Sequence, residues 1–152
     1  MRIAVPYFKQ NTDYTCGPAS LKMVISFLGK FQSEIQLAKI ANTNEDSGTT
    51  HKNMVTVALK EGFQCYEKSG TRISQVKKII KSGLPVIVNY IEPFSDIGHY
   101  AVIVGFEKEN IIMNDPSNGK NFNINEKDFI KRWHSGNSKK WMLVISEEKL
   151  QF

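Results

Sequence analysis

Cysteine, histidine and long hydrophobic runs are all scarce in this chain of 152 residues. Only two cysteines are present, Cys16 and Cys65, so a disulfide scaffold is not expected and four-cysteine zinc sites are excluded. No apolar run approaches the ~18 residues that would suggest a membrane span. The N-terminus lacks the apolar core of a signal peptide. We therefore expect a cytoplasmic protein with free thiols, no membrane span, and no metal or cofactor.

The positive charge of the chain is spread out rather than concentrated. The formal net charge is +5, and the pI is about 9.2. The lysines are scattered, and several stand beside acidic residues, as at 107–109 and 126–128. The densest basic cluster, Lys77, Lys78 and Lys81, fits the solvated face of an amphipathic helix. Because no nucleic-acid recognition motif accompanies this charge, we expect no nucleic-acid partner.

The length and composition predict one globular domain over residues 1–152. A chain of this size typically buries roughly 68–70% of its unfolded surface, which is enough for stability without metal or disulfide links. The sequence contains no low-complexity tract, internal repeat or Pro/Gly-rich linker. We expect a monomer.

Hydrophobic spacing predicts helices in the first half of the chain and mainly strands in the second. Pro18 is placed where the first turn of a helix tolerates it, and Ser33 is a good N-cap for the next helix. The predicted helices cover residues 19–28, 33–41, 52–61, 74–81 and 125–133, and the predicted strands cover 2–8, 63–67, 84–90, 99–106, 110–114 and 141–145, with a polar loop at 42–50. This order indicates an α+β fold in which an antiparallel sheet packs on N-terminal helices.

The strongest local motif surrounds Cys16, in the segment Thr15-Cys16-Gly17-Pro18-Ala19. A cysteine that opens a helix lies near unpaired backbone N–H groups and the positive end of the helix dipole. Such surroundings lower the pKa of a thiol and favour the nucleophilic thiolate. Gly17 places no side chain beside the sulfur, so we expect it to allow the close approach of a substrate. The alternative is a small buried cysteine without chemistry.

A thiol nucleophile needs a base, and the base needs a group that fixes its tautomer. His99 stands at the start of one predicted strand, and Asp115 ends the next. Folding this hairpin about residues 107–109 brings Asp115 opposite residues 99–103, within about a dozen ångströms of His99, or closer with a bulge. We therefore predict Cys16, His99 and Asp115 to act together. An edge histidine and a turn aspartate without chemistry are the alternative.

The other candidate groups fit structural roles better. His51 is expected to be an exposed surface residue at a helix start. His134 lies near a predicted helix end, where a cation is favourable for dipole reasons alone. Cys65 is expected to be a strand cysteine without chemistry.

Four motifs in order, Gln10, Cys16-Gly17-Pro18-Ala19, Gly98-His99-Tyr100 and Asp115-Pro116, resemble the bacteriocin-processing cysteine peptidase family, and the likeness extends over nearly the whole chain. The opening segment, residues 5–10, and residues 83–87 resemble its stand-alone branch. The resemblance implies a papain-like fold with Cys16 as nucleophile, His99 as base, Asp115 as orienter and Gln10 as oxyanion donor. Thr15 occupies a place where the exporter domains of the family usually carry aspartate, so no double-glycine substrate is assigned.

These observations predict a thiol peptidase that hydrolyses peptide bonds in a peptide or protein substrate through a thioester intermediate. Two alternatives remain open from the residues alone. The same triad can serve an acyltransferase or an amidase, and the same fold can serve a non-catalytic peptide-binding module.

Overall fold

The computed structural model describes residues 1–151, and within this range the chain forms one mixed assembly of helices and antiparallel strands. The helices are α1 (Cys16–Phe27), α2 (Glu34–Ile40), α3 (His51–Lys60), α4 (Ile73–Lys81) and α5 (Glu126–Arg132). The main sheet contains β1 (Gln64–Lys68), β2 (Val86–Ile91), β3 (Gly98–Glu107), β4 (Asn110–Asp115), β5 (Gly119–Asn125) and β8 (Met142–Ser146). The short strands β6 (His134–Ser135) and β7 (Ser138–Lys139) form a separate hairpin. No helix formed by residues 1–151 is long and apolar enough to cross a membrane.

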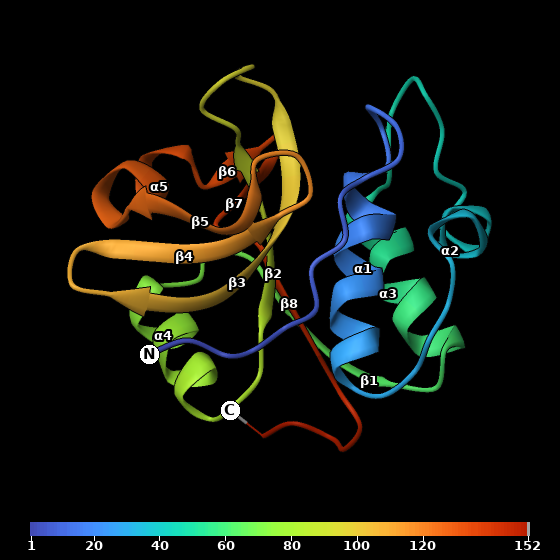
Figure 1. The fold of residues 1–152 in the computed structure, drawn as a ribbon, viewed down its shortest axis with the longest axis horizontal. Coiled ribbons are helices and arrows are strands. Elements are labelled where there is room, and N and C mark those ends of the chain that lie inside the picture. The colour runs from blue at the N-terminus through green and yellow to red at the C-terminus, as the bar shows by residue number, and fades with distance from the viewer. Residues whose placement is uncertain (152) are drawn as a thin grey trace.

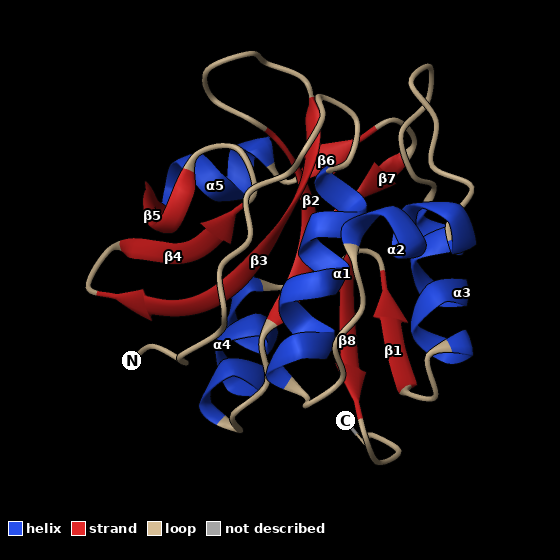
Figure 2. Cartoon of the chain, turned by 45° about the vertical axis from the view of Figure 1, so that its right-hand side comes forward, coloured by secondary structure: helices blue, strands red, loops and turns tan. Residues whose placement is uncertain are grey.

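The main sheet has the strand order β1-β8-β2-β3-β4-β5, and its pairs are antiparallel. Helices α1, α2 and α3 gather on one side, and α4 and α5 lie on the other (Figures 1 and 2). The α+β class and the packing of N-terminal helices on an antiparallel sheet are therefore confirmed. Helices α4 and α5 add a second layer that the sequence pattern did not assign to the opposite face.

Alternation along β3 divides the interior into two cores. Tyr100, Val102 and Val104 belong to the core beneath the N-terminal helices, whereas Ala101 and Ile103 belong to the core beneath α4 and α5. A strand buried on both faces reads as a continuous apolar run, which is the pattern of residues 100–104. β3 is therefore packed on both faces, and this packing also fixes the start of the strand, where His99 lies.

The helix starts follow local capping rules. The Ser33 hydroxyl accepts a hydrogen bond from the backbone N–H of Gln36 at 3.1 Å, and the Thr50 hydroxyl accepts one from the N–H of Asn53 at 3.1 Å. These bonds satisfy donors that the first turn of a helix leaves unpaired. They explain why α2 and α3 begin within a residue of their predicted positions.

The structure departs from the sequence predictions at three places. Residues 2–8 form no continuous strand, because Pro6 lacks an N–H and pairing with the sheet is limited to a bridge between Arg2 and Gly105. β5 and the β6–β7 hairpin were not predicted, since their sequences are polar or very short. Ile35 is an apolar residue within the predicted helix at 33–41, where a helix buries its apolar side chains, yet it is 64% exposed.

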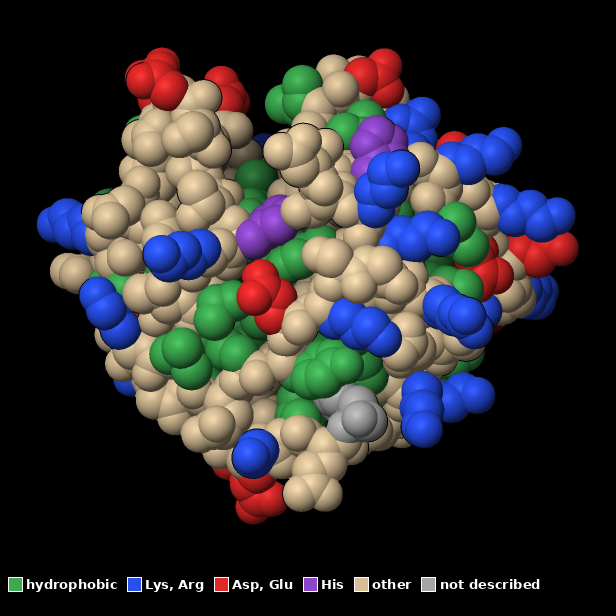
Figure 3. Space-filling model, turned by 180° about the vertical axis from the view of Figure 1, so that it is seen from behind, with side chains coloured by type: hydrophobic (Ala, Val, Ile, Leu, Met, Phe, Trp, Pro, Cys, Tyr) green, Lys and Arg blue, Asp and Glu red, His purple; other side chains and the backbone are tan. Residues whose placement is uncertain are grey.

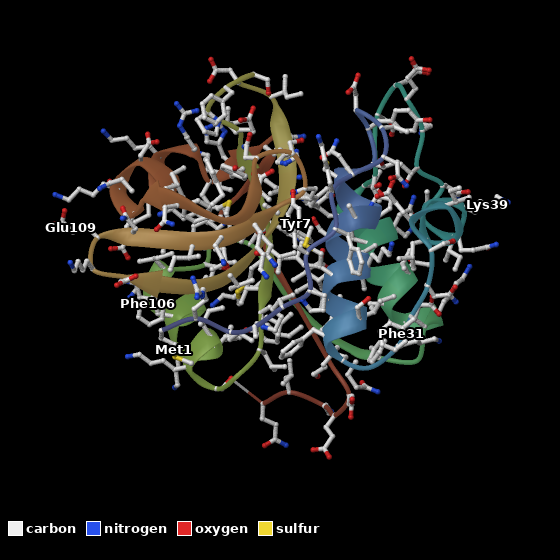
Figure 4. The ribbon with its side chains drawn as sticks, viewed as in Figure 1. Met1, Tyr7, Phe31, Lys39, Phe106 and Glu109 are labelled. Carbon is white, nitrogen blue, oxygen red and sulfur yellow. The ribbon has the colours of Figure 1, made fainter. Side chains whose placement is uncertain are left out.

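Gly105 is where the N-terminal segment crosses the sheet. The backbone N–H of Phe106 donates to the Met1 carbonyl at 2.9 Å, and the two residues lie close together in Figure 4. A Cβ atom on Gly105 would lie 2.3 Å from the Met1 carbonyl oxygen and 2.8 Å from Arg2 Cα, both backbone atoms. Any side chain at this position must therefore push the segment away.

We expect Gly105→Ala to lower the free energy of unfolding by about 1–3 kcal/mol, as overpacking of a tight contact does. Chemical denaturation measures the change. The matched control is the same substitution in a chain lacking residues 1–3, where the obstruction is gone and the penalty should vanish. A penalty of equal size in both backgrounds would show that the close approach is not its cause.

Candidate active site

Cys16 is the first residue of α1 and lies where that helix meets the sheet. The N-cap Thr15 makes no side-chain cap bond, and its hydroxyl instead accepts from the Thr12 N–H at 3.1 Å. The positive end of the helix dipole therefore faces the Cys16 side chain without a capping oxygen from Thr15. The sulfur is only partly buried, and it accepts a hydrogen bond from the backbone N–H of Tyr100 at 3.5 Å.

His99 and Asp115 come together at the end of the β3–β4 pair. The register places Val102 opposite Asn114, and a bulge separates this part of the ladder from the pairs beyond Gly105. His99 Nε2 lies 2.7 Å from Asp115 Oδ1. The proximity predicted from the hairpin, including the bulge, is thus present in the structure.

Asp115 is fully buried, and several donors surround its carboxylate. Oδ1 accepts from the N–H groups of Ser117 and Asn118 at 2.9 and 3.0 Å. Oδ2 accepts from the Tyr90 hydroxyl at 2.5 Å and from Asn118 Nδ2 at 3.2 Å. Burial alone would raise the pKa of this carboxyl, but the bond and charge of His99 together with these donors hold its pKa below the usual value. Asp115 is therefore a fixed anion.

The residues that hold Asp115 were missed by the sequence reasoning. Ser117 and Asn118 follow Asp115-Pro116 in a turn, and an aspartate before such a turn often accepts backbone N–H groups two or three residues on. That local signal could have identified them. Tyr90 gives no such signal because it reaches the carboxylate from β2, 25 residues away.

The opposing influences on His99 leave it protonated at neutral pH. Burial acts to lower its pKa, but hydrogen bonds to Asp115 and Cys16, with the charges of both, raise it to about 10. Because Nε2 is occupied by Asp115, the interaction with Cys16 belongs to the other ring nitrogen, Nδ1. The imidazole thus links a carboxylate on one side with a sulfur on the other.

Gln10 lies next to the turn that follows Asp115. Its backbone N–H donates to the Pro116 carbonyl at 3.1 Å, and its side-chain oxygen accepts from the Ser117 hydroxyl at 2.8 Å. Its Nε2 donates to the Thr12 carbonyl at 2.7 Å, which leaves the second N–H of the amide for another acceptor. The structure therefore ties Gln10 to both the Asp115 turn and the segment before Cys16, and its part in the chemistry stays a prediction.

The N-terminal segment adds a further support. The Tyr7 hydroxyl donates to the backbone carbonyl of Asp115 at 2.8 Å. In Figure 4 Tyr7 lies in the middle of the molecule, between the sheet and α1. Residues far from the site in sequence thus fix the end of β4.

Gly17 has a packing role that differs from the predicted one. A Cβ atom there would lie 2.8 Å from Thr49 Oγ1 and 3.0 Å from Met54 Sδ. The space beside Gly17 is filled by the protein itself. The prediction that Gly17 admits a substrate is therefore wrong, and the residue instead lets α1 approach the start of α3.

His51 is not the exposed surface residue that the sequence suggested. Its ring is partly buried, stacks on Trp141 with centroids 4.0 Å apart, and places Nδ1 2.6 Å from the Tyr100 hydroxyl. Burial lowers its pKa, against a smaller raising effect of Glu67. The burial of His51 was not predicted because the residues that it contacts, Tyr100 and Trp141, are distant from it in the sequence.

The remaining two candidates fit their expected structural roles. His134 is exposed at the start of β6. Cys65 lies in β1, where burial raises the pKa of its thiol to about 11. Among residues 1–151, no group of three or more His, Cys, Asp or Glu side chains is arranged to hold a metal ion.

A cavity of about 250 Å³ opens beside Cys16. It is lined by Cys16, residues 47–51, Asn89, Gly98, Tyr100 and Ser135. The loops that join α2 to α3 and β2 to β3 project at the same end of the molecule (Figure 1), and the space-filling view is hollowed between two raised parts (Figure 3). The site therefore has room for a ligand next to the sulfur.

Comparison with known proteins gives the family. The model of the Peptidase_C39-like family matches residues 2–140. The chain belongs to this family. An uncharacterized protein of Methanothermobacter marburgensis is 29% identical over 141 residues, which are 93% of this chain and 88% of that protein. The resemblance noted in the sequence is confirmed.

Two solved structures have the same fold. A C39-like protein from Bacillus anthracis has a TM-score of 0.79 at 15% identity, covering 99% of this chain and 100% of that one. A double-glycine-motif protease from an AMS/PCAT transporter, solved with a leader peptide, has a TM-score of 0.78 at 22% identity, covering 95% and 93% of the two chains. The papain-like fold of the Peptidase_C39-like chain is therefore established.

Removing the Cys16 sulfur should remove two of the influences that raise the pKa of the His99 ring. In Cys16→Ala we expect the pKa of the His99 ring to fall, because a hydrogen bond and a charge that both raise it are lost. Imidazole ¹H–¹⁵N spectra recorded against pH measure this, with exposed His134 as a reference signal in the same protein. A His99 titration that is identical in the two proteins would mean that the ring does not interact with the sulfur.

The raised pKa of His99 also sets the pH range of a stability contribution. Its pKa in the folded chain, about 10, exceeds the ordinary value of 6.5. The protonated ring therefore contributes stability in full below about pH 6.5, and this contribution is lost as pH rises towards 10. Asp115→Asn should flatten that alkaline decline in urea-denaturation measurements. A decline of unchanged steepness in the variant would contradict the assignment.

Proposed function

We propose that this Peptidase_C39-like protein is a thiol peptidase, with residues 1–152 acting as one domain. Cys16 is the nucleophile, His99 the general base and acid, and Asp115 the residue that orients the imidazole. The observation that carries the proposal is the bond between His99 Nε2 and buried Asp115 Oδ1, which directs Nδ1 to the helix end occupied by Cys16.

The acylation half-reaction starts from a Cys16 thiolate paired with the His99 imidazolium. The sulfur attacks the carbonyl carbon of a peptide bond, forming a C–S bond and an oxyanion. The backbone N–H of Cys16 and the side-chain amide of Gln10 stabilise that oxyanion. The intermediate collapses with breakage of the C–N bond, and His99 Nδ1 gives its proton to the departing amine. A thioester on Cys16 remains.

The deacylation half-reaction restores the enzyme. Neutral His99 removes a proton from water, and the resulting hydroxide attacks the thioester carbonyl. Breakage of the C–S bond releases the carboxylic acid product and regenerates the thiolate, while His99 holds the proton as imidazolium. Asp115 keeps the same nitrogen, Nε2, engaged during both steps.

A peptide substrate suits both the site and the relatives. The cavity beside Cys16 is open to the surface and large enough for a few backbone atoms with small side chains. The transporter protease of the same fold was solved with a leader peptide. The chemistry requires a reduced thiol, which agrees with the predicted cytoplasmic location.

Cys16→Ala should abolish the cleavage of every peptide that the wild type cuts in a peptide-library digest read by mass spectrometry. The thermal transition should stay cooperative because the thiol is replaced by a smaller group at a partly exposed position. Adding a primary amine to the wild-type reaction identifies an acyltransferase, since an amide product would then appear beside the acid. Equal turnover by the variant would refute the nucleophile assignment.

Gln10→Ala should reduce kcat by about 10²–10³ with little change in KM, as the loss of one oxyanion donor typically does. The matched control is Ser117→Ala, which removes the hydroxyl partner of the Gln10 side-chain oxygen but leaves the amide in place. This control should retain most of the activity. Equal losses in the two variants would assign Gln10 a structural role only.

A further inference from the structure

The cavity beside Cys16 contains a polar atom that the folded chain leaves unsatisfied. Asn89 lines the cavity and is 6% exposed. Among the residues that the structure describes, its Oδ1 has no hydrogen-bond partner. A buried acceptor without a donor costs free energy, so its presence in a site calls for a binding partner.

The neighbouring Tyr100 hydroxyl is not available as a hydrogen-bond donor to Asn89 Oδ1. The Tyr100 hydroxyl donates its single proton to the Thr49 carbonyl at 2.8 Å, so it can only accept from other groups. Asn89 stands opposite Tyr100 in the β2–β3 ladder, so the two side chains lie on the same face of the sheet, and both residues line the cavity. The hydroxyl beside Asn89 therefore cannot supply the donor that its buried Oδ1 lacks.

His51 secures this arrangement from the other side. Because the Tyr100 proton is used by Thr49, the contact of 2.6 Å between His51 Nδ1 and the Tyr100 oxygen has the imidazole as donor. The ring is held against Trp141 by stacking. The Tyr100 hydroxyl is therefore held in place, with its proton given to Thr49 and not to Asn89.

Gly98 leaves the approach to Asn89 Oδ1 unobstructed by a side chain. A Cβ atom on Gly98 would lie 3.5 Å from that oxygen and 2.7 Å from Ser135 Oγ. Both Gly98 and Ser135 also line the cavity. A methyl group at position 98 would occupy the space between them.

The geometry of acylation indicates which part of a substrate enters this cavity. The reacting carbon of the tetrahedral intermediate carries the sulfur, the oxyanion, the leaving nitrogen and the rest of the acyl chain. The oxyanion belongs beside Gln10, and the leaving nitrogen belongs beside His99, yet neither residue lines the cavity. The acyl chain is the substituent that remains for it.

We propose that Asn89 Oδ1 binds a backbone N–H of the substrate on the acyl side of the scissile peptide bond, because the Tyr100 hydroxyl, held by Thr49 and His51, cannot satisfy this oxygen. This inference rests on the proposed peptidase function and adds a specificity-determining residue to it. It makes the cavity a subsite for a hydrogen-bond donor rather than a purely steric pocket.

The test is a scan of N-methylated substrates. A peptide that the wild type cleaves is resynthesised with a single N-methyl group at each acyl-side residue in turn, which removes one backbone N–H at a time. At one position we expect kcat/KM to fall about three- to tenfold, the effect of losing one neutral hydrogen bond. Asn89→Leu should cleave the parent peptide with a similar loss, and N-methylation at that position should cost nothing more.

Two further variants test the role of Asn89 separately from the proposed peptidase function. Asn123→Leu, at an exposed position on β5, should keep the wild-type sensitivity to N-methylation. Gly98→Ala combined with Ser135→Ala tests the same subsite from another strand and should reproduce the insensitivity of Asn89→Leu, which keeps the test intact if that variant does not fold.

The outcomes distinguish the two levels of the proposal. Losses from N-methylation that persist undiminished in Asn89→Leu at every position would overturn the role of Asn89 while leaving the peptidase intact. A wild-type protein that cleaves no peptide of the library would overturn the proposed function and the subsite with it.

Discussion

The buried hydrogen bond between His99 and Asp115 is the constraint around which the rest of the site is arranged. Asp115 is fully buried, and His99 is 6% exposed, so both groups lose nearly all contact with water. Removing a charge from water is costly unless good partners replace the solvent. The backbone donors at residues 117 and 118 and the Tyr90 hydroxyl supply those partners. The turn after β4 is therefore part of the site's electrostatics as well as of its shape.

The two sides of the site come from different layers of the fold. Cys16 is carried by α1 on the N-terminal helical layer, whereas His99 and Asp115 are carried by neighbouring strands of the sheet. The layers are joined directly at the site, because the Tyr100 N–H reaches the Cys16 sulfur. A displacement of α1 from the sheet would separate the sulfur from the imidazole. Gly17 prevents such a displacement by letting α1 pack against Thr49 and Met54.

Features encoded within a few residues were predictable from the sequence, and those that depend on distant partners were not. The caps of α2 and α3 and the apolar run of β3 follow local rules, so these elements were located closely. The His99–Asp115 pairing was accessible because a single hairpin separates the two residues. The burial of His51 depends on Tyr100 and Trp141, and the support of Asp115 depends on Tyr90, and none of these contacts has a local signature.

The edge strand β5 shows a second limit of predicting strands from the sequence. β5 runs from Gly119 to Asn125 with three asparagines, residues that are usually depleted in strands. It forms because β4 offers an unpaired edge, and tertiary pairing overrides the weak propensity. The segment 2–8 is the reverse case, in which residues of good strand propensity find little backbone to pair with.

The most direct measurement of the central claim is the alkylation of the two thiols by iodoacetamide at pH 6, followed by peptide mapping. Cys65 is an internal control because burial raises the pKa of its thiol to about 11. A sulfur paired with the His99 imidazolium predicts rapid labelling of Cys16, no labelling of Cys65, and loss of the Cys16 reaction in His99→Ala. Equal and slow labelling of both cysteines, unchanged by His99→Ala, would contradict the account.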